Sequence, residues 1–91
     1  MAAIEKTFYG NSSAQKVKSK AISGTNVVTV SSNAGLLWGF SADVEALGKI
    51  TDNTANIAFV NKNSIWFNQP VAFDTSLKIT LSAGKAVVYY E

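Results

Sequence analysis

Carboxylate side chains are the groups of this chain with the clearest capacity for chemistry. Asp43 and Glu45 stand two residues apart and would share one face of an extended strand, while Asp52 and Asp74 stand among turn residues. Two carboxylates at a fixed separation are what a glycosidase needs, and clustered oxygen ligands are what Ca²⁺ prefers. No calcium-loop spacing is present, and nothing in the sequence marks either carboxylate of the pair as buried. We therefore interpret these acids as solvated surface groups and predict neither a bound metal nor a cofactor.

Three residue types that the sequence lacks narrow the chemistry further. It contains no histidine, no cysteine and no arginine. These types supply much of the acid–base chemistry near neutral pH, the nucleophilic thiols, the transition-metal ligands and the bidentate phosphate clamps of small proteins. A Ser-His-Asp triad cannot be assembled without histidine. We therefore expect a binding protein without catalytic residues.

A row of lysines marks the N-terminal quarter of the chain. Lys16, Lys18 and Lys20 alternate with apolar or small residues, so a strand would project all three ammonium groups from one face. Such a row either contacts an acidic partner or phosphates, or protects an edge strand against unwanted pairing. We name the three lysines as candidate contact residues. Because all eight cations are lysines and the net charge is only +2, we do not expect nucleic acid as a partner.

Aromatic side chains offer a second candidate contact. Adjacent aromatic residues stand in the predicted strands at 66–67 and 89–90, and neighbours on a strand point to opposite faces. Alternation predicts Ile65 and Phe67 as core residues, which leaves Trp66 pointing outward, where a neighbouring subunit, a covering loop or a sugar can meet it. The side chains considered for stacking on a sugar are Trp38, Trp66 and Tyr90.

Short β-strands must position these residues. The predicted strands are Asn26–Ser31, Leu36–Val44, Asn56–Asn61, Ser64–Phe67, Val71–Phe73, Leu77–Leu81 and Ala86–Tyr90. Turn-forming residues separate them about every 10–12 residues. This spacing predicts an all-β fold, a small antiparallel β-sandwich or jelly-roll-like barrel of about seven to nine short strands.

Local patterns add detail to three segments. Leu77–Leu81 alternates cleanly, which places Leu77, Ile79 and Leu81 inward, and the Gly-containing link 82–85 that follows predicts a hairpin. Period-two spacing puts Trp38 and Phe40 on one face of their strand. A short helical turn near Glu45–Leu47 is an alternative that the sequence leaves undecided. Pro70 belongs at a sheet edge or in a bend because proline lacks the amide donor.

Length and composition predict one domain, residues 1–91, in which 1–25 form either an N-terminal arm or an edge strand. Charged residues make up 15% of the chain, against the usual figure of roughly 25%. Such a neutral surface suits a subunit that is partly covered in a homo-oligomer. Neither a signal peptide nor a membrane-spanning run is evident, so we expect synthesis in the host cytoplasm and no membrane partner.

Three stretches of the sequence carry a resemblance to a known group of proteins. They are AGLLWGFSADV (34–44), IAFVNKNSIWFNQPVAF (57–73) and LKITLSAGKAVVYYE (77–91). Over residues 26–91 their order resembles small all-β accessory proteins of tailed-phage virions, especially capsid decoration proteins. The resemblance implies a non-enzymatic virion protein, often oligomeric and with a trimer favoured, whose partner is the major capsid protein or another virion subunit.

The same resemblance implies how the contact would be made. The protein would bind where subunits of the assembled shell meet, through Lys16, Lys18 and Lys20 and through an outward Trp66. Two alternatives remain open at this point. One is a carbohydrate-binding or receptor-binding module, and the other is a tail or baseplate subunit.

Overall fold

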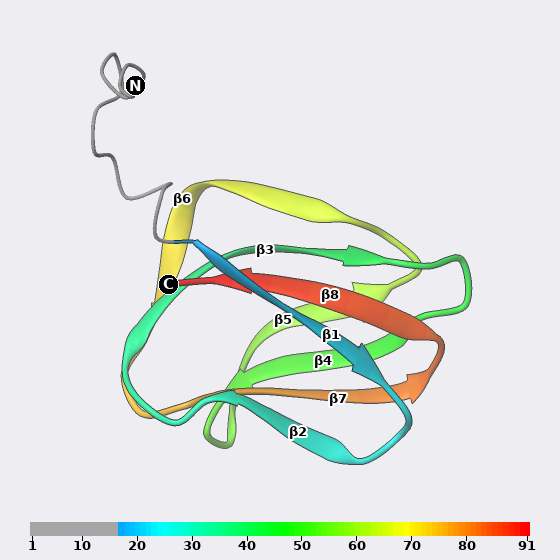
Figure 1. The fold of residues 1–91 in the computed structure, drawn as a ribbon, viewed down its shortest axis with the longest axis horizontal. Coiled ribbons are helices and arrows are strands. Elements are labelled where there is room, and N and C mark those ends of the chain that lie inside the picture. The colour runs from blue at the N-terminus through cyan, green and yellow to red at the C-terminus, as the bar shows by residue number, and fades with distance from the viewer. Residues whose placement is uncertain (1–16) are drawn as a thin grey trace.

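The computed structural model describes residues 17–91, and in this range it contains eight strands and no helix (Figure 1). The strands are β1 (Lys18–Ser23), β2 (Val27–Ser31), β3 (Gly35–Ala42), β4 (Leu47–Asp52), β5 (Ala55–Asn61), β6 (Ile65–Phe73), β7 (Leu77–Ala83) and β8 (Lys85–Tyr90). The all-β prediction is confirmed. Within 17–91 there is accordingly no helix with the length and apolar character to cross a membrane.

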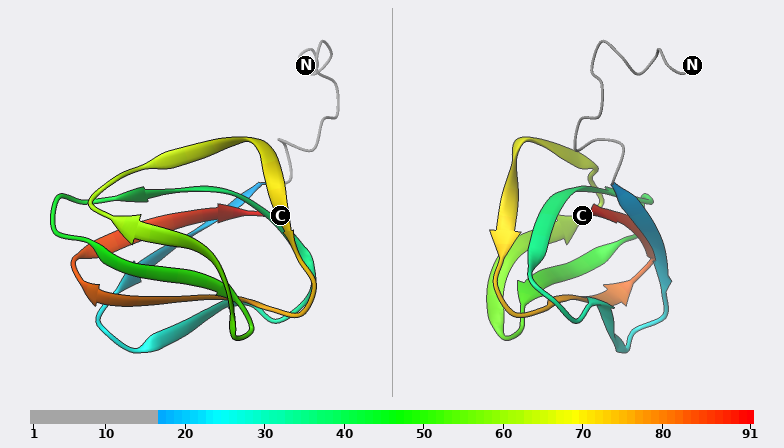
Figure 2. Two further views of the ribbon diagram at one scale, coloured as in Figure 1. Left: turned by 180° about the vertical axis from the view of Figure 1, so that it is seen from behind. Right: turned by 60° about the vertical axis from the view of Figure 1, so that its left-hand side comes forward.

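The strands pair in the order of a jelly roll. Sheet A has the order β1-β8-β3-β6 and sheet B the order β2-β7-β4-β5 (Figures 1 and 2). The first strand pairs with the last, the second with the last but one, and so on inward to β4 and β5, all antiparallel. The chain thus resembles one long hairpin that is folded over into two layers. The pairing of β3 with β8 joins two hairpin segments into sheet A, and the pairing of β4 with β7 joins the other two into sheet B. The jelly roll is the second of the two predicted architectures.

The predicted hairpin at 82–85 is wrong. β7 lies in sheet B and β8 in sheet A, so the chain turns a corner between the sheets instead of folding back on its neighbour. Gly84 makes this corner with φ +75, a conformation that glycine adopts without steric cost. The β4–β5 connection is the one link among the described strands that stays within its own sheet.

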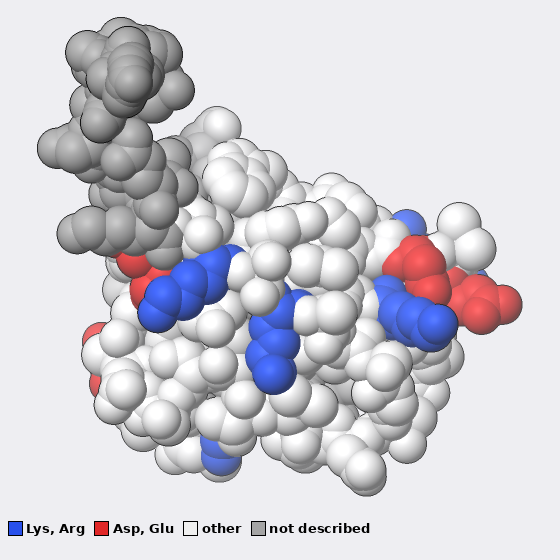
Figure 3. Space-filling view, viewed as in Figure 1, with Lys and Arg blue, Asp and Glu red and all other residues white. Residues whose placement is uncertain are grey.

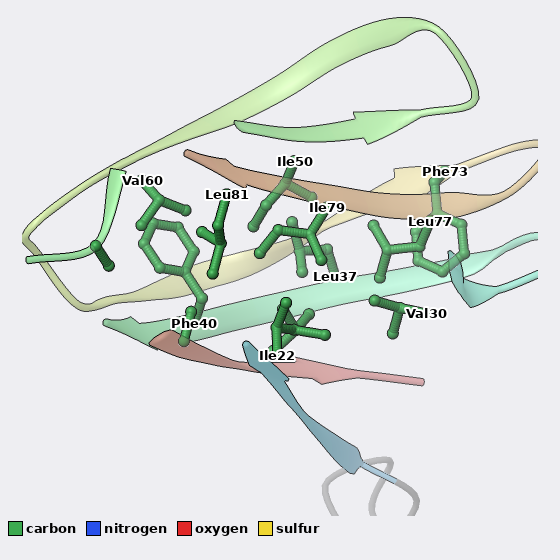
Figure 4. Close-up of a cluster of buried hydrophobic side chains, with 13 residues drawn as sticks. Ile22, Val30, Leu37, Phe40, Ile50, Val60, Phe73, Leu77, Ile79 and Leu81 are labelled. Atoms are coloured by element: carbon green, nitrogen blue, oxygen red, sulfur yellow. The ribbon is translucent and has the colours of Figure 1, made fainter. Parts of the chain in front are cut away.

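The hydrophobic core lies between the two sheets. Leu77, Ile79 and Leu81 of β7 are fully buried, as their alternation predicted. Figure 4 shows side chains from sheet A, among them Leu37 and Phe40, turned toward this row. Each fully buried side chain of this size contributes about 1.5–3 kcal/mol relative to an exposed one, so the interior packing between the sheets is the main source of stability.

The third strand departs from the period-two prediction. β3 ends at Ala42 rather than Val44, and its register shifts between Leu37 and Gly39 against both neighbours. Leu37 and Phe40 are both buried although they stand three residues apart. A β-bulge at Trp38 explains this, because one extra residue reverses the alternation beyond it. Trp38 and Phe40 therefore do not share a face.

Two other segments also differ from the prediction. β4 was not predicted, because its large inward apolar side chain is Ile50 alone and Gly48 and Lys49 precede it. The segments expected as two strands around Pro70 form the single strand β6, at the edge of sheet A. Its pairing with β3 is interrupted between Trp66 and Val71, so Pro70 lies at an edge where no ladder hydrogen bond is lost.

Candidate functional site

The two predicted contact surfaces lie at opposite edges of sheet A. Lys18 and Lys20 belong to β1 at one edge, and Trp66 belongs to β6 at the other, with β8 and β3 between them. With neighbouring strands spaced by roughly 4.8 Å, about 14 Å separates the two edge strands. Lys16, the third predicted lysine, lies outside the described residues. The structure therefore does not bring the described lysines and Trp66 into one site.

The lysines of β1 share a strand face with a core residue. Lys18 pairs with Tyr90 and Lys20 with Val88, and both alternate in phase with Ile22, which is buried. At the rim of the sheet both lysine side chains nevertheless remain exposed. Inward-phased lysines on an edge strand oppose pairing with another chain, and the same ammonium groups are accessible to an acidic surface.

Charged groups are scattered over the surface. Figure 3 shows lysines lying apart from one another on one face of the molecule, with uncharged surface between them. An isolated surface charge contributes little to binding, because water and salt screen it. A partner must therefore combine several contacts to gain affinity from these lysines.

Trp66 points outward, as predicted, with 58% of its side chain exposed. The prediction that Ile65 lies in the core is wrong, because Ile65 is itself 37% exposed. Phe67 is half-buried and packs against the core cluster. Ile65 is the first residue of β6, an edge strand with a paired neighbour on one side only, so alternation alone does not bury it.

Three aromatic rings meet on the outer side of sheet A, and we call Trp38, Trp66 and Tyr89 the aromatic cluster. The rings of Trp38 and Trp66 are stacked with centroids 5.9 Å apart and planes at 24°. The rings of Trp66 and Tyr89 are tilted at 60° with centroids 5.8 Å apart. Gly39 pairs with both Tyr89 and Trp66, and a Cβ there would stand 3.2 Å from the Trp66 ring. The missing side chain makes room for the indole.

Hydrogen bonds fix two of the three rings. The indole Nε1 of Trp38 donates to Oε1 of Glu91 at 3.2 Å, and the hydroxyls of Tyr89 and Ser41 are 3.2 Å apart. Tyr90, named as a sugar-stacking candidate, packs instead against the core. The alternation of β8, in which Ala86, Val88 and Tyr90 face inward, is the sequence signal that singles out Tyr89.

A hollow of about 430 Å³ adjoins the aromatic cluster at one end of sheet A. Its lining residues are Ala21, Ile22, Ser23, Ser41, Ala42, Asp43, Lys85, Ala86 and Val87. Ala21, Val87 and Ser41 are lateral neighbours on β1, β8 and β3. Since they lie in phase with Tyr89, they face the outer side of the sheet. Ser41 thus belongs to both features and joins the hollow to the aromatic cluster.

Asp43 and Glu45 do not share a strand face, because both lie in the turn between β3 and β4. This turn is closed by a hydrogen bond from Ala46 N to Asp43 O at 3.2 Å, and no helical turn forms there. The Asp43 carboxylate accepts hydrogen bonds from Glu45 N at 3.0 Å and from Lys85 N at 3.2 Å. It therefore ties the β3–β4 turn to the β7–β8 corner and forms the polar end of the hollow.

Asp52 plays a similar capping role at the opposite end of the sandwich. Its carboxylate accepts backbone hydrogen bonds from Asp74 at 2.8 Å, Thr75 at 3.0 Å and Ser76 at 3.2 Å. The N–H groups of Asp74 and then Thr75 are the main reason that the pKa of Asp52 lies below its ordinary value. Asp52 is thus a structural anchor for the β6–β7 loop.

Acidic side chains do not gather into a metal site within residues 17–91. Comparison of the chain with protein-family models, with curated proteins and with solved structures found no match. Three features therefore remain from which a function can be inferred. They are the aromatic cluster, its neighbouring hollow, and the lysine edge, which is formed by Lys18 and Lys20 of β1.

Proposed function

We propose that this chain is a non-enzymatic structural protein of a tailed-phage virion, a decoration protein that binds the assembled capsid as a homo-oligomer, with a trimer favoured. The observation that carries the proposal is the exposed pair Lys18 and Lys20 on the open edge of sheet A. Trp66 lies at the opposite edge of sheet A, whereas Tyr89 of the aromatic cluster stands on the strand next to β1 and pairs with Ser19. The resemblance of residues 26–91 to decoration proteins supplies the class of partner.

The weakness of a single lysine edge favours an assembled shell as the partner. An exposed ion pair contributes about 0.2–1 kcal/mol, so two or three lysines do not hold a monomer on an isolated capsid subunit. A shell repeats the same acidic surface at symmetric positions, and a homo-oligomer engages several copies at once. Linked contacts of this kind raise overall affinity by about 10²–10⁴-fold without any new type of contact.

The lysine edge, rather than Trp66, is the proposed shell contact. Lys18 and Lys20 are both exposed on β1, and in the sequence Lys16 precedes them at the same spacing. Trp66 lies at the far edge of sheet A and on its outer side, where the same flat partner surface does not reach it. The domain would thus lie on the shell by β1 and present the aromatic cluster elsewhere.

Co-sedimentation with purified particles tests the proposal. We expect the protein to pellet with assembled particles and not with isolated subunits, and the double variant Lys18→Glu/Lys20→Glu to lose this association. The matched control is Lys49→Glu/Lys78→Glu, which changes the net charge equally but lies on the outer side of sheet B. Failure of the wild-type protein to associate with any particle, or equal loss in both double variants, would contradict the proposal.

A tail or baseplate location shares the same fold and is the nearest alternative. Localisation of the protein in a purified particle by immunogold labelling separates the two, because a decoration protein covers the head. Light scattering gives the oligomeric state, for which we expect a trimer. A stable monomer would remove the multivalency on which shell binding depends.

A further inference from the structure

We propose that the outer side of sheet A carries a binding site for a neutral saccharide, formed by the aromatic cluster and the adjoining hollow. Lys18 and Lys20 are not part of this site, although Ala21 of the same strand lines it, and the site does not depend on attachment to a shell. Trp66 provides the stacking surface, and the hollow over β1, β8 and β3 holds the adjoining part of the ligand. The proposal follows from ring geometry, from the polar groups of the hollow and from their charge.

The aromatic cluster has the geometry of a preorganised stacking platform. Trp66 has a relative exposure of 58%, and its ring contacts those of Trp38 and Tyr89 at centroid distances of 5.9 and 5.8 Å. Those two rings are in turn held by hydrogen bonds and stand on paired strands. The C–H face of a sugar ring is apolar and electropositive, which complements the electron-rich face of an indole. Little ordering entropy is lost on binding, because the rings are already fixed.

The hollow supplies the polar complement that a sugar requires. Its lining combines the apolar residues Ala21 and Val87 with the polar residues Ser41 and Asp43. Each Asp43 oxygen accepts one backbone hydrogen bond, which leaves further lone pairs for ligand hydroxyls. The volume of about 430 Å³ falls within the range of small-molecule sites, roughly 300–1,000 Å³.

The charge of the hollow selects a neutral ligand. Asp43 and Lys85 line it together, one acid and one base, so its formal charge is zero. A ligand with phosphate, sialic acid or uronic acid groups would face the Asp43 carboxylate, and a cationic ligand would face the Lys85 ammonium. A neutral polyhydroxylated ligand can donate to the carboxylate and accept from the ammonium. For the same reason a single-stranded nucleic acid, whose phosphates need several cations, is disfavoured here.

A glycan array combined with tryptophan-fluorescence titration tests the site. We expect the full-length protein to bind one class of neutral oligosaccharide and to show no preference for acidic ones. Trp66→Ala should weaken this binding about tenfold or more, which corresponds to the roughly 1.4 kcal/mol of one aromatic contact. Trp66→Tyr should retain most of it. The matched control is Phe59→Ala, which removes an aromatic side chain that is 62% exposed on the outer side of sheet B.

A second variant addresses the hollow without touching the aromatic cluster. Ala21→Phe places a ring into the hollow from the exposed edge strand β1, and we expect it to abolish glycan binding while circular dichroism shows an unchanged fold. Association with particles should survive Trp66→Ala, because Trp66 lies at the edge of sheet A opposite the lysines, so failure of this site and failure of shell binding are distinguishable. The proposal is overturned if no neutral glycan binds, if Trp66→Ala binds as tightly as the wild type, or if only nucleic acid binds.

Discussion

Replacing two glycines by alanine, one at a time, separates two costs of substitution: the cost of a positive φ and the cost of a steric overlap. Gly24, in the β1–β2 link, and Gly84, at the β7–β8 corner, both have positive φ, +88 and +75. A Cβ at Gly24 would meet nothing within 4 Å, whereas a Cβ at Gly84 would stand 2.5 Å from the Cα and backbone nitrogen of Ala46 and 2.6 Å from Oδ1 of Asp43. Both substitutions therefore carry the cost of placing alanine at positive φ, but only Gly84→Ala also creates a steric overlap with neighbouring atoms.

The shared cost is small. A left-handed alanine costs about 1–2 kcal/mol, and loss of freedom in the unfolded chain offsets about 0.4–1 kcal/mol of it. Gly24→Ala should therefore lower the free energy of unfolding by about 1 kcal/mol. With a urea m-value of about 1 kcal/mol/M for a domain of this size, the unfolding midpoint should fall by about 1 M.

The contact at Gly84 adds a larger cost, because its surroundings cannot move independently. Ala46 accepts a hydrogen bond from Lys62 N at 2.7 Å, and Asp43 N donates to Lys85 O at 3.1 Å. Relief of the overlap would strain the corner by about 1–3 kcal/mol and break one or two of these hydrogen bonds at about 1 kcal/mol each. Together with the shared cost of about 1 kcal/mol, Gly84→Ala should thus lower the free energy of unfolding by about 3–6 kcal/mol.

Urea titrations followed by tryptophan fluorescence measure both midpoints. We expect Gly84→Ala to shift the midpoint at least twice as far as Gly24→Ala, or to lose the folded baseline. Equal shifts would refute the packed corner, because a solvent-exposed hairpin between β7 and β8 would leave the Cβ of residue 84 in open space. The comparison therefore tests the crossing between sheets as well as the local contact.

Three further predictions concern the core, the Asp52 cap and the aromatic cluster. Phe40→Ala should lower the free energy of unfolding by about 3–5 kcal/mol, since the ring is 1% exposed; a loss below about 1 kcal/mol in urea titration would contradict the assigned core. Because the pKa of Asp52 is lowered in the folded state, its carboxylate stabilises the fold above its ordinary pKa of 3.8, and this stability is lost as pH falls through the folded value. The stability gap between wild type and Asp52→Asn should therefore be full at pH 7 and shrink in acid, and a gap independent of pH would be inconsistent with the cap. In Gly39→Ala the added Cβ would overlap the backbone oxygen of Ile65 and stand 3.0 Å from the Cα of Trp66, so the β6 backbone must shift, and the indole with it, at a cost of about 3 kcal/mol; an unchanged tryptophan emission spectrum would contradict this contact.

Strand identity could be predicted from the sequence where alternation is strict and the strand is internal. Leu77–Ala83 satisfies both conditions, since it lies between β2 and β4 and buries every second residue. Strand pairing could not be predicted in the same way, because a Gly-containing link fits a hairpin and a corner between sheets equally well. At Gly84 only the packing of distant segments, such as the turn at Asp43–Ala46, decides between them.

The candidate site was predictable in part for a similar reason. Outward exposure of Trp66 follows from its position beside Phe67, and the structure confirms it. The partnership with Trp38 depends on the bulge in β3, which no local pattern reveals. Asp43 links the β3–β4 turn to the β7–β8 corner by accepting a hydrogen bond from Lys85 N. Because Lys85 is distant in the sequence, this contact forms only when β3 and β8 have paired, and the sequence alone does not reveal it.

The nested pairing of the strands also sets an order for folding. Only β4 and β5 pair across a short loop, whereas β1 must find β8 at the other end of the chain. Loop closure therefore favours a nucleus at β4–β5, followed by pairing outward, on the millisecond-to-second timescale typical of sandwiches with distant contacts. Because β1 pairs with β8 alone, and β8 is the most distant strand in the sequence, we expect β1 to join late. The lysine edge thus exists only after β1 has joined, so an incompletely folded chain lacks the surface that would attach it to a shell.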